Sequence, residues 1–230
     1  MKRTGICLAL AVFALCLAGC AMESAKKNTM ATFQWSSTNK RVLLVAPDVQ
    51  LSELTAGGVT EPRADWTQAA QGFVAGDIKA YFVKKDAQLI QVEGETPHEV
   101  QLVKLHAAVG QAILTHLYNE NLKLPNKGDA LDWSLGPGTN EMRDRHGADY
   151  ALFVFIRDSY SSDSRRALQV LGALAGVGLP GGVQIGFASL VDLRTGNIVW
   201  FNRLISGSGD LRTGAQAQAT VDALIRNMPI

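Results

Sequence analysis

The chain has very little cysteine: its 230 residues include only Cys7, Cys16 and Cys20, all within the first twenty. The rest of the sequence therefore offers no thiol for a disulfide framework, a cysteine zinc site, an iron–sulfur cluster or a cysteine nucleophile. An excess of charge of one sign is also missing, since 22 Lys and Arg residues balance 21 Asp and Glu residues. That balance argues against a nucleic-acid-binding protein that depends on a broad basic field.

No arrangement of residues in the sequence predicts catalysis or a bound metal. The four histidines lack metal-ligand spacing; His106 and His116, for example, are ten residues apart rather than three or four. The segment 206–209 lacks the G-x-S-x-G nucleophile elbow. Residues 176–181 match the dinucleotide pattern G-x-G-x-x-G, but a helix-like stretch precedes them and a strand-like stretch follows. We therefore predict no catalytic residue, no metal and no cofactor.

The first twenty residues have the layout of a secretory signal. Lys2 and Arg3 form a positive head, and an uninterrupted apolar run covers residues 6–18. This run is too short to span a bilayer, which needs about 20 apolar residues. Small residues then precede Cys20, as they do at a cleavage site. The sequence thus predicts an exported protein.

Leu17, Ala18, Gly19 and Cys20 resemble the lipobox of bacterial lipoproteins. The resemblance implies cleavage before Cys20 and its acylation, including palmitate; an ordinary cleaved signal with an incidental cysteine is the alternative. The next residue is Ala21 rather than Asp, which by resemblance to enterobacterial sorting implies the outer membrane. We expect a signal peptide at 1–19, a lipidated N-terminus and flexible tether at 20–39, and a periplasmic domain at 40–230.

Apolar runs and turn signals predict the elements of that domain. Strands are expected at 41–46, 88–92, 149–156, 186–193 and 197–205, with the last two forming a hairpin around Gly196. Helices are expected from Pro62 to Phe82, after the capping sequence at 96–99, at 140–146 and within 211–228. Together they predict a single α/β (α+β) domain whose mixed sheet has about four to six strands, packed with about three or four helices.

Two finer expectations concern burial. In the helix after residue 99, the spacing of Val100, Val103 and Ala107 predicts the side that faces the core. The charged residues at 143–145 and 158–166, which flank the strongest predicted strand, are expected to form solvated loops, with a polar interaction surface as the alternative. Both expectations follow from polarity alone.

The segment 167–187 carries no charge at all. Its first half reads as an apolar helix that Pro180 and its neighbouring glycines end, so it is too short to cross a membrane. Three interpretations remain open: packing within the domain, contact with a membrane, or contact with another protein subunit. The candidate interface residues are Ala167, Leu168, Val170, Leu171, Leu174, Val177 and Leu179.

The second half of the domain resembles a group of bacterial envelope proteins. Ala148, Asp149 and Tyr150 open an apolar strand as in their core, and the hairpin at 190–200 is similar to that of the curli secretion channel family. The N-terminal domain of the Tol-Pal translocation protein and the lipoprotein activators of penicillin-binding proteins have related folds. The resemblance implies an anticodon-binding-like α/β domain that serves envelope assembly without chemistry of its own.

The leading hypothesis is therefore a non-enzymatic outer-membrane lipoprotein. Its membrane contact would be the N-terminal lipid, and its periplasmic domain would bind envelope proteins, with no nucleic acid among its partners. A homo-oligomeric secretion or channel-like component is the first alternative, although the sequence lacks two clear amphipathic membrane hairpins. An envelope hydrolase whose Ser, Asp or His residues meet only on folding is the second.

Overall fold

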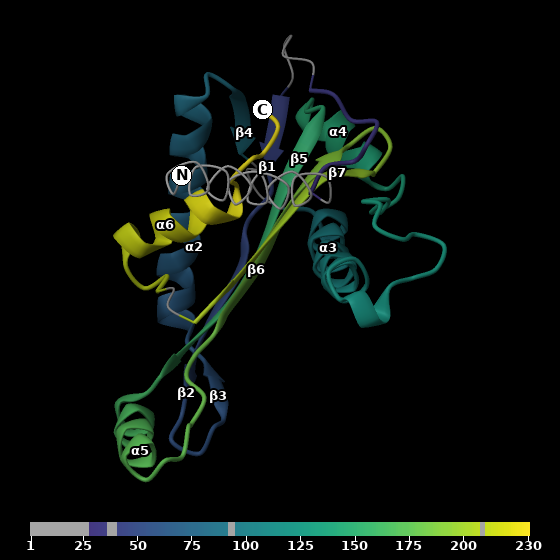
Figure 1. The fold of residues 1–230 in the computed structure, drawn as a ribbon. Coiled ribbons are helices and arrows are strands. Elements are labelled where there is room, and N and C mark those ends of the chain that lie inside the picture. Colours follow the sequence, from purple (N-terminus) through teal and green to yellow (C-terminus); the bar gives the residue numbers. More distant parts are fainter. Residues whose placement is uncertain (1–27, 36–40, 92–94, 208–209) are drawn as a thin grey trace, which may run out of the picture.

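The computed structural model describes residues 28–35, 41–91, 95–207 and 210–230. Within these ranges, a single mixed α/β domain contains seven strands and five α-helices, and it ends in a β-hairpin and a C-terminal helix (Figure 1). The expected fold class is confirmed, with more strands and helices than expected. In chain order the elements are β1 Arg41–Leu44, β2 Asp48–Leu54, β3 Thr60–Pro62, α2 Ala64–Lys84, β4 Gln88–Gln91, α3 Pro97–His116, the 3₁₀ turn η1 Glu120–Leu122, α4 Thr139–His146, β5 Tyr150–Ser161, α5 Asp163–Leu174, β6 Gln184–Asp192, β7 Ile198–Ser206 and α6 Gly214–Leu224.

The sheet is organised around β5, its longest strand. One side of β5 pairs with β6, which pairs with β7, and both pairings are antiparallel. The other side of β5 pairs in parallel with β1 near its start and with β2 further along. Strand β4 lies outside β1, and β3 lies outside β2. The sheet therefore forks on this side of β5.

Strands β1 and β2 follow β5 as one strand interrupted by a bulge. Four steps separate Leu44 from Asp48, but only three separate their partners Leu152 and Phe155, so one extra residue is accommodated between them. Pro47 lies in this interruption, where its missing N–H costs no ladder hydrogen bond. The bulge lets β5 continue well past the body of the domain.

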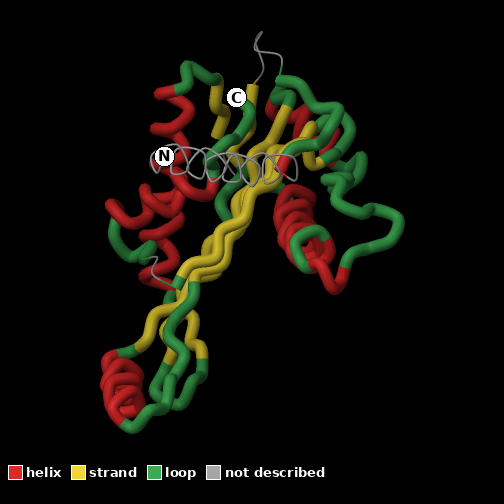
Figure 2. The backbone as a smooth tube through the Cα atoms, in the orientation of Figure 1, coloured by secondary structure: helices red, strands yellow, loops and turns green. Residues whose placement is uncertain are grey.

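Helices cover both faces of the sheet near the start of β5. Helices α2 and α6 pack on one face and α3 with α4 on the other, as Figure 2 shows, so the body has three layers. Trp200 is fully buried on the α2 side, and Phe153, Phe187 and Phe201 are fully buried on the α3 side. The core thus lies in the upper half of the sheet in Figure 1.

Local sequence signals fix several element ends as expected. Thr96 and Glu99 form a reciprocal capping box at the start of α3, with Pro97 in its first turn. Gly147 ends α4 in the left-handed conformation at φ 63°, and Gly196 takes φ 77° in the β6–β7 turn. Both conformations are costly for residues with a Cβ atom, so glycine is required there.

Three sequence expectations were wrong. Pro62 ends strand β3 instead of starting the helix, which begins two residues later. The fully buried side of α3 is offset by one residue from the expected stripe and consists of Glu99, Leu102, His106, Gly110 and Ile113. Val103 and Ala107 of the expected stripe also pack against the core but are only partly buried. Residues 158–161 continue strand β5 instead of forming a solvated loop, and Asp158 is only 3% exposed. A histidine, a glycine and a carboxylate are thus buried where polarity alone predicts exposure.

Candidate functional site

The far end of the sheet forms an arm that extends beyond the helices of the body. The ends of β5 and β6 run together with β2 and β3, and α5 lies across their end (Figure 1). We call α5 and the following loop, residues 163–183, the tip. The tip joins strands that are continuous with the core, so its position is fixed by the sheet.

Arg165 attaches the tip to the arm. Its guanidinium donates hydrogen bonds to the carbonyl oxygens of Ala56, at 3.3 Å, and of Pro180, at 3.0 Å. Gln169 also donates to the Pro180 carbonyl, at 3.1 Å. The polar side of α5 is therefore used to hold the β2–β3 loop and the loop after α5 together. Arg165 is 8% exposed, which corrects the expectation of a solvated charge cluster there.

The opposite side of α5 presents apolar side chains to solvent. Leu174 is 82% exposed, and Val170 and Leu171 are each just over 60% exposed. With Ala167, also exposed, these residues follow an i, i+3, i+4, i+7 spacing and form one stripe. Leu168 and Val177 extend it. Packing within the domain does not account for these six side chains.

Leu179 differs from the other candidate interface residues because it is half-buried. The loop after α5 folds back onto the helix, and the Val177 N–H donates to the Gly172 carbonyl at 2.7 Å. A Cβ atom at residue 172 would lie 3.5 Å from the Leu179 side chain. Gly172 thus allows the loop to pack closely against α5, with Leu179 facing the helix.

A buried polar cluster lies where the arm leaves the body. The Tyr160 hydroxyl and the Gln184 side-chain amide both donate to Asp158 Oδ2, the second at 2.6 Å. Thr220 of α6 donates to Gln184 Oε1 at 3.2 Å, and the Leu211 N–H donates to the Tyr160 oxygen at 2.7 Å. Burial raises the pKa of Asp158, and these hydrogen bonds only partly oppose it. The cluster connects β5 and β6 to α6, and sequence reasoning missed it.

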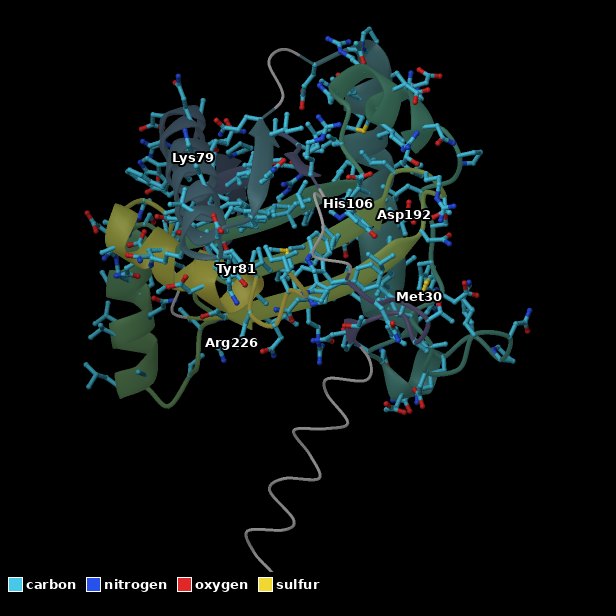
Figure 3. All side chains as sticks on the ribbon, turned by 90° about the horizontal axis from the view of Figure 1, so that it is seen from above. Met30, Lys79, Tyr81, His106, Asp192 and Arg226 are labelled. Carbon is cyan, nitrogen blue, oxygen red and sulfur yellow. The ribbon has the colours of Figure 1, made fainter. Side chains whose placement is uncertain are left out.

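His106 lies between α3 and the sheet, well away from the surface (Figure 3). Its Nε2 is 2.9 Å from Ser189 Oγ on β6, and its ring stacks on Phe153. Burial lowers the pKa of His106 from 6.5 to about 3, so the ring is neutral at physiological pH. The ring is 1% exposed and its hydrogen-bond partner is a hydroxyl group rather than a carboxylate, so this His–Ser pair supports packing rather than catalysis.

His146 and Glu99 form the closest histidine–carboxylate pair among the described residues, at 2.6 Å. The other oxygen of Glu99 accepts the Thr96 N–H at 2.7 Å as part of the capping box. Burial opposes ionisation, but the Thr96 and His146 hydrogen bonds outweigh it, and the pKa of Glu99 lies below its usual range. The carboxylate is thus committed to joining the start of α3 to the end of α4.

The remaining sequence motifs take ordinary positions. Residues 176–181 lie between α5 and β6, so a helix precedes the glycines and a strand follows, as expected. Within the described ranges, no three His, Cys, Asp or Glu side chains lie close enough together to hold a metal ion. In the same ranges, no helix is both long and apolar enough to cross a membrane. Cys20 lies outside the described residues.

Comparison with known proteins finds no matching family model and no matching curated sequence. Among solved structures, the PelC dodecamer from Paraburkholderia phytofirmans is 11% identical, with a TM-score of 0.36 over 85% of this chain and 92% of that one. Lipoprotein GNA1162 from Neisseria meningitidis is 13% identical, with a TM-score of 0.31 over 79% and 92%. The LpoB C-terminal domain from Salmonella enterica is 14% identical, with a TM-score of 0.27 over 74% and 84%. Likeness at this level assigns neither a function nor a partner.

Proposed function

We propose that the chain is a lipid-anchored envelope protein, held at the periplasmic face of the outer membrane, that acts as a non-enzymatic protein-interaction module. The lipobox at 17–20 supports the anchor, and the exposed apolar stripe of α5 supports the interaction. The stripe carries the proposal, because contiguous apolar side chains at an extended tip mark a contact surface rather than a core.

The buried polar groups support a non-enzymatic role. Asp158, His106 and Glu99 each have hydrogen-bond partners that account for their positions within the fold. Each lies within the packed interior, and the contacts described above serve to join elements. The exposed apolar side chains of the tip would gain free energy when a partner removes them from water.

The anchor is tested by replacing Cys20 with Ala in the full chain. Without the thiol no diacylglyceryl group can be attached, so we expect palmitate labelling to be lost and the protein to leave the membrane fraction. Acylation with several chains, at about 0.8 kcal/mol per buried methylene, otherwise holds a protein durably. Palmitate labelling of the Cys20→Ala protein equal to that of the wild type would contradict the lipobox interpretation.

The interaction surface is tested by photo-crosslinking in intact cells. A photoreactive residue placed at Leu171 is expected to give an adduct with a distinct envelope protein. The matched control places it at Val83 of α2, which is 73% exposed and lies on the body. Adding Leu174→Asp is expected to abolish the Leu171 adduct, with a change in unfolding free energy within about 0.5 kcal/mol because the side chain is exposed.

The mass of the crosslinked adduct also distinguishes a distinct partner from self-assembly of this chain. Residues 167–191 carry no charge, so two copies could meet at the tip without opposing like charges. An adduct of twice the chain mass at Leu171 would favour the homo-oligomer over a distinct partner. Equal adducts from Leu171 and Val83, or none from either, would contradict an interaction surface at α5.

A further inference from the structure

Strand β4 has an open outer edge. It is the last strand of the sheet beyond β1, and within the described part of the chain it pairs only with β1 (Figure 1). The backbone N–H and C=O groups of a strand are shared between its two edges, so those that point away from β1 have no strand to pair with. Residues 88–91 include neither a charged residue nor a proline, the residue types that commonly block such an edge. The edge is therefore a template for one short strand.

A groove of about 560 Å³ lies beside this edge, between β4 and the last turns of α2. Its lining is mainly apolar and includes Phe82 and Val83 of α2 and Leu89 of β4. Val83 is 73% exposed, and among the described large apolar side chains only Leu174 is more exposed. Successive side chains of a strand point to opposite faces of the sheet. One row of side chains from a strand added to β4 would thus lie over α2 and this groove.

Lysine side chains give this end of α2 a positive charge. Lys79 lines the groove, and Lys84 and Lys85 follow Val83 directly in the sequence. All three are exposed, and none forms an ion pair with a described carboxylate. Asp86, in the turn before β4, offsets one of these charges. Lys84 also complements the negative end of the helix, but Lys79 precedes the last turn and is not explained in this way.

We propose that β4 and this groove bind an extended acidic segment of another protein, which adds to the sheet as an edge strand. The length of β4 limits the pairing to four residues. Main-chain hydrogen bonds to β4 would supply affinity, and the side chains of the segment would supply specificity. Its apolar side chains would cover Val83, and its carboxylates would face Lys79. This surface lies on the body, so the proposal does not depend on the α5 stripe.

A strand fits this edge better than the other occupants that an apolar groove suggests. A lipid chain or a helix would cover the outward backbone groups of β4 without pairing them, and an unpaired buried amide costs free energy. A strand pairs these groups and fills the groove with its side chains at the same time. A basic segment would bring like charges together at Lys79, which opposes its binding. The backbone edge thus selects an extended segment, and the lysines select an acidic one.

Peptide binding to the full chain, processed by the cell and purified in detergent, tests the proposal. The probe is a capped, fluorescent peptide of alternating glutamate and valine, and the comparison peptide has lysine in place of glutamate. We expect fluorescence anisotropy to show that the glutamate peptide binds at least about ten-fold more tightly. Added salt should reduce this difference, because the attraction is between exposed charges. Hydrogen exchange of the β4 amides should slow when the glutamate peptide binds.

Two pairs of variants locate the binding site. Lys79→Glu is expected to weaken binding of the glutamate peptide at least about five-fold, whereas Lys104→Glu, at an exposed lysine of α3, should leave it unchanged. Val83→Asp should also weaken it, and the matched control Val59→Asp, at a valine that is 62% exposed in the β2–β3 loop, should not. All four side chains are exposed, so the comparisons do not depend on a change in folding.

A third peptide separates strand addition from attraction between charges alone. Proline in place of its central valines removes backbone N–H donors but keeps every carboxylate, so its binding should fall to that of the lysine peptide. Equal binding of the proline and glutamate peptides, no binding of the glutamate peptide, or binding unaffected by Lys79→Glu would overturn the proposal. The α5 surface is tested separately, because a protein trapped at Val83 through this groove would differ in mass from the Leu171 adduct.

Discussion

Lowering the pH from 7 to 5 is expected to reduce the free energy of unfolding by about 2 kcal/mol through His106 alone. Burial of this ring lowers its pKa in the folded protein to about 3, against an ordinary value of 6.5. Between these two values the unfolded chain binds one more proton than the folded chain. Stability therefore falls as the pH falls below 6.5, by about 1.4 kcal/mol for each pH unit.

The surroundings of His106 explain why the folded protein does not accommodate the proton. The ring is stacked on Phe153 at 5.0 Å and tilted against Phe187 at 5.3 Å, and its polar contact is Ser189. An imidazolium there would lose its hydration without gaining a carboxylate. Two carboxyl groups with shifted pKa values change the overall loss of stability in acid in opposite directions. The lowered pKa of Glu99 adds to this loss, and the raised pKa of Asp158 reduces it.

Urea unfolding at pH 7, 6 and 5 measures this dependence. The double variant His106→Leu with Ser189→Ala removes the titrating ring and its hydroxyl partner together. Its unfolding free energy should change less with pH than that of the wild type, by about 2 kcal/mol over this range. The control Ile113→Val should lower stability by about 1 kcal/mol at every pH and keep the wild-type slope. Parallel curves for the wild type and the double variant would contradict a neutral buried histidine.

Features that depend on a few adjacent residues were predictable from the sequence. The Thr96–Glu99 capping box and the left-handed Gly147 and Gly196 each need only local residue types in a fixed order. The uncharged run that begins within α5, at residue 167, was equally visible. In each case the physical cause, a helix end or a turn or a lack of charge, is contained within a short stretch of chain.

Features that depend on distant partners were not predictable in the same way. Asp158 is buried because Gln184 and Tyr160 donate to it, and Gln184 lies 26 residues further along the chain. The sheet forks because β1 and β2 both follow β5 across the bulge at Pro47. The uncharged segment also divides: its end enters the core as β6, whereas its start lies on the tip. Whether an uncharged stretch is buried or exposed here depends on whether it lies in the body or on the arm, which the sequence does not indicate.

The buried side of α3 was misjudged because its central residue has no side chain. Gly110 has no side chain, so it adds nothing to a hydrophobic pattern. Among the described helical glycines, however, it makes the closest approach to a side chain of the sheet, that of Phe187. A Cβ atom at residue 110 would lie 2.0 Å from Phe187 Cε2 and 2.4 Å from Cζ. Glycine is present because the helix packs on an aromatic ring, at a cost of about 1 kcal/mol in helix propensity.

Replacing Gly110 with Ala is accordingly expected to destabilise the protein by about 2–3 kcal/mol, although alanine is the better helix former. Phe187 cannot easily move aside, since its ring is stacked on Phe155 at 4.6 Å and on Phe201 at 5.6 Å. The matched control is Gly72→Ala in α2, where an added Cβ meets nothing within 4 Å. This change should stabilise the protein by about 0.5–1 kcal/mol.

A double-mutant cycle separates the steric clash from any general weakness of the helix. Phe187→Leu alone should destabilise the protein, because it removes ring contacts from the core. Combined with Gly110→Ala it should cost less than the sum of the two single changes, since the smaller side chain leaves room for the added methyl group. A coupling of about 1 kcal/mol or more in urea unfolding would assign the effect to this contact. If the two costs instead added within about 0.3 kcal/mol, Phe187 would not be what requires glycine at residue 110.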